Sequence, residues 1–209
     1  GCGLLSSNLD DFELALPEKQ FVVDTAQWGL RVPPGEFPSV SCSNSCVVDP
    51  PLCDPATCVG ACVNSTCEIS VPFSLYQPVN LALENPEFEQ VDQGARVRVK
   101  EILFAVTENT LNVGTPPLQV FLAPFAVVTP DDPGAQHVGD ILPIPAGQVY
   151  TGRIQFTTEG MIIAETYMSA YSEAFNFIVA GTALIRGGDP VPTGRVVGNI
   201  TGTLIADRI

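Results

Sequence analysis

The sequence predicts a mainly β protein: an antiparallel β-sandwich with one helix, preceded by a small disulfide-stapled segment. Three observations lead to this fold class. Apolar and polar residues alternate along several runs after residue 68, as in Val97-Arg98-Val99-Lys100. Glycine, proline and Asx clusters separate these runs, for example at Pro130–Gly134 and Gly187–Pro190. Six of the seven cysteines fall between residues 42 and 67.

The runs predict seven strands and one helix in the second part of the chain. Turn signals between many short strands are typical of a sandwich. A helix is expected from Thr157 or Thr158 to about Glu173, because a threonine can cap it and Ile162, Ile163 and Tyr167 form an apolar stripe. The expected strands are 68–76, 79–84, 95–107, 117–128, 148–157, 175–186 and 194–206.

The first part of the chain has a different character. Phe12, Leu14 and Leu16 alternate with other residues, and a second β-like run begins at Phe21, so Pro17 is expected to separate two short extended pieces. Trp28, the only tryptophan, is expected to be a core or interface anchor. We therefore divide the chain into a tether (1–11), short strands with a disulfide-rich segment (12–67) and a sandwich domain (68–209).

The six clustered cysteines predict three disulfides and an oxidising compartment. Their spacing is C-x3-C-x6-C-x4-C-x3-C-x4-C, without the C-x2-C pairs of zinc sites or iron–sulfur runs. The segment has no apolar periodicity, so crosslinks must hold it together. Six cysteines allow 15 pairings, and the sequence does not choose among them. The cysteines are Cys42, Cys46, Cys53, Cys58, Cys62 and Cys67.

The seventh cysteine stands alone near the N-terminus. Gly1-Cys2-Gly3 resembles the end of a bacterial lipobox, in which a glycine precedes the lipidated cysteine. The resemblance implies an exported lipoprotein with lipid on Cys2, and it leaves an even number of other cysteines. Gly3, in place of Asp, implies outer-membrane sorting or surface display. The alternative for Cys2 is a free thiol or another disulfide.

A second resemblance concerns the fold alone. Leu83-Glu84-Asn85-Pro86 and Ile144-Pro145-Ala146-Gly147 resemble turns of the water-stress/LEA-type β-sandwich domains. This resemblance agrees with the predicted sandwich, and no functional residue is carried over from that family.

Charge and motif content predict a binding protein without nucleic-acid, cofactor or enzymatic function. The net charge of −14, from 23 acids and 9 bases, repels phosphate backbones. His137, the only histidine, lies in a turn-rich stretch, and no nucleophile elbow or dinucleotide fingerprint occurs. A hydrolase would need an acid pair in a cleft, and the scattered acids are better explained as solvated surface.

The expected function is therefore interaction with a protein partner, or self-assembly, at the cell envelope. Long apolar runs such as Val120–Val128 must be covered internally or by a partner. The alternative is a binding module for a small molecule, a carbohydrate or calcium. For calcium, the candidate ligands are Asp131, Asp132 and Asp140, although their spacing matches no known calcium loop.

Overall fold

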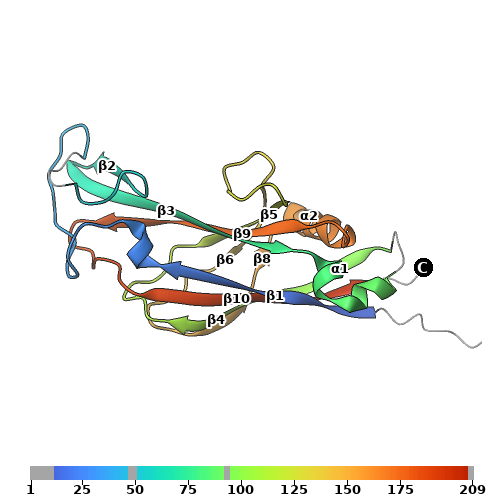
Figure 1. Ribbon diagram of the computed structural model, residues 1–209. Coiled ribbons are helices and arrows are strands. Elements are labelled where there is room, and N and C mark those ends of the chain that lie inside the picture. Colours follow the sequence, from blue (N-terminus) through green and yellow to red (C-terminus); the bar gives the residue numbers. More distant parts are fainter. Residues whose placement is uncertain (1–11, 47–50, 92–94, 207–209) are drawn as a thin grey trace, which may run out of the picture.

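The protein is a sandwich of two antiparallel sheets (Figure 1), as the sequence predicts. The computed structural model describes residues 12–46, 51–91 and 95–206. The four-stranded sheet has the order β1 (Phe12–Asp24), β10 (Arg195–Ala206), β4 (Val97–Asn109), β7 (Tyr150–Arg153). The six-stranded sheet has the order β2 (Val59–Val63), β3 (Thr66–Val79), β9 (Phe175–Arg186), β5 (Leu118–Pro124), β6 (Gln136–Ile141), β8 (Gln155–Phe156).

β1 is one strand of 13 residues, where the sequence predicted two pieces. Pro17 falls in a register shift between Leu16 and Lys19 along the β1–β10 ladder. β1 is an edge strand, so a bulge can accommodate a proline there without breaking the pairing. Leu14, Leu16, Phe21 and Val23 are buried, so the strand contributes to the sandwich core on both sides of the proline.

Helix α2 (Thr158–Ser169) confirms the predicted helix and ends four residues earlier than expected. The Thr157 side chain accepts a hydrogen bond from Gly160 N at 2.8 Å, as an N-cap should. Gly160 lets the helix lie directly on the six-stranded sheet, because a Cβ atom there would come within 1.9 Å of Val138 O. Ala164 and Met168 continue the buried face of the helix.

The single strand expected over 148–157 is divided between β7 and β8, which belong to different sheets. Two other errors concern residues 79–84 and β6. Residues 79–84, predicted as a strand, instead contain the short helix α1 (Leu81–Glu84). Asn80 caps this helix through Leu83 N, and the Glu84 carboxylate accepts a hydrogen bond from Asn80 N at 2.9 Å, so local side-chain bonds outweigh the β-like pattern. The second error is β6, which lies in a stretch predicted as a loop and is held between β5 and β8.

One hydrophobic cluster joins the stapled segment to the sandwich. Trp28, Phe37 and Cys53 belong to the same cluster as Leu14, Val120 and other residues of both sheets. β3 begins at Thr66 and passes through the boundary that the sequence suggested between residues 67 and 68. The 3-10 helices η1 (Thr25–Trp28) and η2 (Pro86–Gln90) complete the secondary structure of the described residues.

Candidate functional site

Three disulfides staple the end of the molecule that carries the β2–β3 hairpin (Figure 1), which confirms the predicted number of bridges. Cys62 and Cys67 lie opposite each other across the hairpin. The hairpin turns through Asn64 and Ser65, whose φ angles of 49° and 63° are those of a type I′ turn. The segment before the hairpin is thereby tied to both of its strands. The pairs are Cys42–Cys62, Cys46–Cys67 and Cys53–Cys58.

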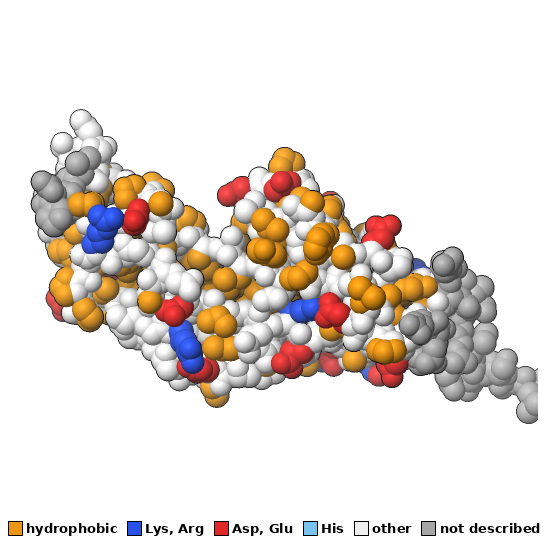
Figure 2. Space-filling model, in the orientation of Figure 1, with side chains coloured by type: hydrophobic (Ala, Val, Ile, Leu, Met, Phe, Trp, Pro, Cys, Tyr) orange, Lys and Arg blue, Asp and Glu red, His pale blue; other side chains and the backbone are white. Residues whose placement is uncertain are grey.

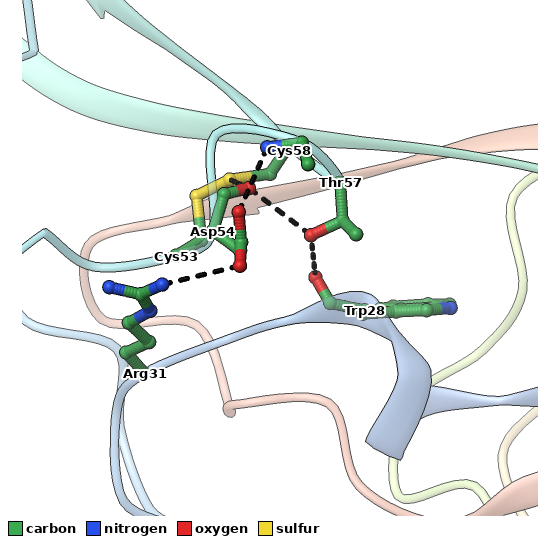
Figure 3. Close-up of a disulfide and its surroundings, with 7 residues drawn as sticks. Trp28, Arg31, Cys53, Asp54, Thr57 and Cys58 are labelled. Atoms are coloured by element: carbon green, nitrogen blue, oxygen red, sulfur yellow. Dashed lines mark hydrogen bonds and ion pairs between the residues drawn. A yellow bond between two sulfur atoms is a disulfide. The ribbon is translucent and has the colours of Figure 1, made fainter.

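The Cys53–Cys58 loop positions the only tryptophan (Figure 3). Thr57 Oγ1 donates a hydrogen bond to Trp28 O at 2.8 Å. Asp54 organises the loop: its carboxylate accepts hydrogen bonds from Ala56 N at 3.0 Å and from Arg31 Nη2 at 3.2 Å. The bond from Ala56 N, together with the nearby Arg31 guanidinium, holds the pKa of Asp54 below its ordinary value.

The Trp28 indole stacks on Phe73 of β3, inside the stapled end of the sandwich. The ring centroids are 5.6 Å apart and the planes are inclined by 15°. Trp28 is 7% exposed. The stacked pair lines hollows on two sides, one toward the edges of β1 and β3 and one toward β9. The two rings therefore form a wall between these hollows.

The hollow toward β9 is an apolar cavity of about 400 Å³. We call it the β9 cavity. It exists because β5 begins only at Leu118, after Pro116 and Pro117, so no described strand pairs with the end of β9 on that side. It is lined by Val23, Trp28, Phe73, Leu111, Val113–Pro116, Thr182–Ile185, Asp189, Pro190 and Pro192.

A third hollow, which we call the outer hollow, lies next to the β9 cavity on the outer face of the six-stranded sheet. It measures about 340 Å³ and lies between β3, β9 and the residues that follow β5, including Thr129 and Pro130. Figure 2 shows a depression on this side of the molecule, between the stapled end and the projecting β5–β6 connection. Phe73 and Thr182 line both hollows, which therefore adjoin.

Charge is sparse in these hollows and has one sign. Asp189 is the charged residue lining the β9 cavity, and Asp131 is the one lining the outer hollow. The Asp189 carboxylate accepts a hydrogen bond from Arg186 N at 2.8 Å. The site therefore suits an apolar group beside a neutral or positive one and disfavours carboxylates and phosphates.

Of the residues singled out from the sequence, Trp28 lines the β9 cavity, whereas His137 and the candidate calcium ligands are not part of its lining. His137 is in β6, where its ring contacts Phe121 edge-on at 5.4 Å and its Nε2 lies 3.1 Å from Asp140 Oδ1. Asp131 and Asp132 lie in the β5–β6 connection, and the described residues contain no cluster of three or more potential metal ligands. Cys2 lies outside the described residues.

Comparison with known proteins gives no assignment. No family model matches the sequence, and no curated protein matches it. In the described part of the chain, no helix is long and apolar enough to cross a membrane. The three disulfides are compatible with an exported protein, because disulfides persist in oxidising compartments. The function must therefore be argued from the site itself.

Proposed function

We propose that this protein is an exported, lipid-anchored interaction protein that binds a protein partner through its stapled end and turns over no substrate. The observation that carries the proposal is the β9 cavity, whose described lining is mainly apolar, with two threonines and one acid. General acid–base catalysis needs a titrating group beside the reacting atoms. Asp189 alone supplies no acid–base pair, and His137 is on a different strand, paired with Asp140.

The distribution of charge favours the six-stranded sheet as the binding face. Neighbouring strands of the four-stranded sheet are linked by ion pairs, such as Arg195–Glu108 and Arg153–Glu101. On the six-stranded sheet, residues 70–78 of β3 and 176–184 of β9 include no charged residue. A sheet face without charge is less costly to desolvate against a partner.

Lipid on Cys2 is the proposed anchor. The other six cysteines pair with one another, which leaves none of them as a disulfide partner for Cys2. β1 begins at the end of the molecule opposite the stapled hairpin (Figure 1). At about 3.3 Å per residue, its 13 residues span about 40 Å. An anchor before β1 would hold the stapled end and the β9 cavity away from an outer-membrane surface.

The anchor is tested by replacing Cys2 with Ser. The variant should leave the membrane fraction and become soluble, because a diacyl anchor binds membranes firmly and no helix of the described residues is long and apolar enough to cross a membrane. The intact mass of the native protein should show the lipid and three disulfides. A Cys2→Ser protein that remains in the membrane fraction contradicts the anchor.

The binding function is tested on the complex extracted from membranes. Leu184 lines the β9 cavity and is 45% exposed, so Leu184→Lys should dissociate the native complex. Val149→Lys, at a residue that is 68% exposed and outside the cavity, is the matched control. His137→Ala should have no effect. Loss of a measurable substrate turnover in His137→Ala, with the complex intact in Leu184→Lys, would replace this proposal with an enzyme.

A small-molecule module is the second candidate. About 400 Å³ falls within the range of small-molecule sites, and the Trp28–Phe73 pair offers an aromatic wall. In that case the native chain should be monomeric and should carry a bound apolar compound, visible by native mass spectrometry. Self-assembly would instead show as a homo-oligomer in sedimentation that Leu184→Lys dissociates.

A further inference from the structure

We infer that the end of β9 accepts an extended segment of a partner protein as an added strand, with an apolar side chain of that segment in the β9 cavity and a basic one beside Asp189. The inference rests on the proposed binding function and names the chemistry of the partner. It follows from the backbone, the cavity and the charge, taken in turn.

The backbone of β9 has an open edge at Thr182 and Leu184. Thr182 lies opposite Pro72 in β3. Proline has no N–H, so this pair is of the type that exchanges no hydrogen bonds, and Thr182 directs its N–H and C=O away from β3. Leu184, two residues further along the same strand, has the same orientation.

No strand of the described residues occupies that side of β9. The β9–β5 ladder stops at the Ala180–Gln119 pair, and the next position of the adjoining segment is Pro117, which has no N–H to donate. At the end of β9, Arg186 N donates a hydrogen bond to the Asp189 carboxylate and is therefore not available to a ligand. Within the described chain, two N–H and two C=O groups thus remain for a ligand at Thr182 and Leu184.

The cavity lies directly beside this edge. Ala183 alternates with Thr182 and Leu184, so it faces the interior of the sandwich, where its small side chain lines the cavity. A strand added to β9 would send every second side chain into that space, against Phe73 and Trp28. An aliphatic or aromatic side chain would be desolvated there.

The negative charge at the end of the cavity indicates that the partner segment carries a basic residue. The lining of the β9 cavity has one charged residue, Asp189, at the end of the open edge. The whole chain carries a charge of −14. A segment with Lys or Arg at the position facing Asp189 gains attraction from both, whereas an acidic segment is repelled. The occupant is therefore an extended, apolar and basic peptide segment.

The test uses nine-residue random peptides displayed on phage and selected on the folded, disulfide-intact protein. Selection should enrich alternating sequences with one large apolar residue and a Lys or Arg. The best peptide should change the emission of Trp28, the only tryptophan, and should slow hydrogen exchange at the amides of Thr182 and Leu184. Methylation of the peptide's backbone nitrogens should abolish binding at one set of alternate positions and spare the other set.

Three variants complete the experiment. Ala183→Phe fills the cavity and should weaken binding by more than about tenfold, or about 1.4 kcal/mol. Val149→Phe places the same ring at an exposed position outside the cavity lining and should not weaken binding. Asp189→Asn keeps an oxygen acceptor for Arg186 N and should weaken only peptides that carry Lys or Arg. If Ala183→Phe does not fold, the exchange and methylation results decide.

The inference is overturned if selection enriches no peptide. It is also overturned if the amides of Thr182 and Leu184 remain unprotected or if backbone methylation has no effect, because the cavity would then bind a side chain or small molecule without adding a strand. Failure of this site can be told from failure of the binding function. A native complex that persists in Ala183→Phe keeps the function and rejects the site, whereas a monomeric native protein rejects the function.

Discussion

The Cys42–Cys62 bridge should contribute about 3 kcal/mol to the free energy of unfolding. It joins residues 20 apart in sequence. In the chain-entropy description, closing such a loop removes about 11 cal/mol/K from the unfolded chain, or about 3.3 kcal/mol at 25 °C. Cys46–Cys67 closes an overlapping loop, so the path released by cutting one bridge is shorter and the loss is slightly smaller.

The perturbation is the double replacement Cys42→Ala with Cys62→Ala, with the other bridges kept oxidised. Unfolding in urea is followed by Trp28 emission and by circular dichroism of the sheets. Because Trp28 and both sheets share one hydrophobic cluster, both signals should shift together. The matched control is Ser43→Ala with Val63→Ala, next to the same cysteines, which should change stability by less than about 0.5 kcal/mol.

Two results would refute this reasoning. A loss below about 1 kcal/mol would mean that the unfolded chain gains little freedom when the bridge is removed. A shift in Trp28 emission with an unchanged circular dichroism transition would mean that the stapled end unfolds independently of the sandwich.

Two further predictions concern packing and pH. Gly160→Ala should destabilise the protein by about 2 kcal/mol, because the added Cβ collides with Val138 O. Thr166→Ala, on the exposed side of α2, should have little effect on stability. Chemical unfolding measures the free energy of unfolding of both variants. Hydrogen bonds from Arg195 lower the pKa of Glu108 in the folded protein. The stabilisation from this pair is therefore present at pH values above the unfolded-state pKa of about 4.5, and it is lost as the pH falls through the folded-state pKa. In Arg195→Gln, an NMR titration should show the Glu108 pKa returning upward, and an unchanged pKa would contradict the assignment.

The strands that the sequence predicted best are those with one clear dry face. Four strands lie within a few residues of their expected ranges: β3, β4, β9 and β10. In these strands the alternation of apolar and polar residues follows the alternation of buried and exposed side chains. β6 was missed because Pro133 and Gly134 dominate the local pattern, although Val138 and Ile141 are buried. Residues 79–84 were misread because an apolar run of that length fits a strand as well as the single helical turn that Asn80 caps.

The candidate site was beyond prediction from the sequence for a different reason. Trp28 was recognised as an anchor, and its partner Phe73 lies 45 positions along the chain. The β9 cavity depends on where β5 stops beside β9 and on the small side chain of Ala183, which faces the opposing layer. No local pattern encodes the absence of a neighbouring strand. The strand expected over 117–128 began at Pro117, and only the sheet order shows that β5 starts at Leu118 and leaves the end of β9 unpaired on that side among the described residues.

The open edge of β9 differs from the way this fold treats its outermost strand. β1 has a free edge 13 residues long, and side chains from other elements bond to its outward carbonyls: Gln77 Nε2 donates to Gln20 O at 2.7 Å, and Asn85 Nδ2 donates to Ala15 O at 3.0 Å. Exposed edges promote aggregation, which explains this protection. At Thr182 and Leu184 no described side chain plays that part, and the neighbouring Pro117 cannot. The open edge of β9 lies beside an apolar cavity, whereas side chains bond to two carbonyls of the β1 edge. A strand supplied by a partner would pair with the open edge and fill the cavity.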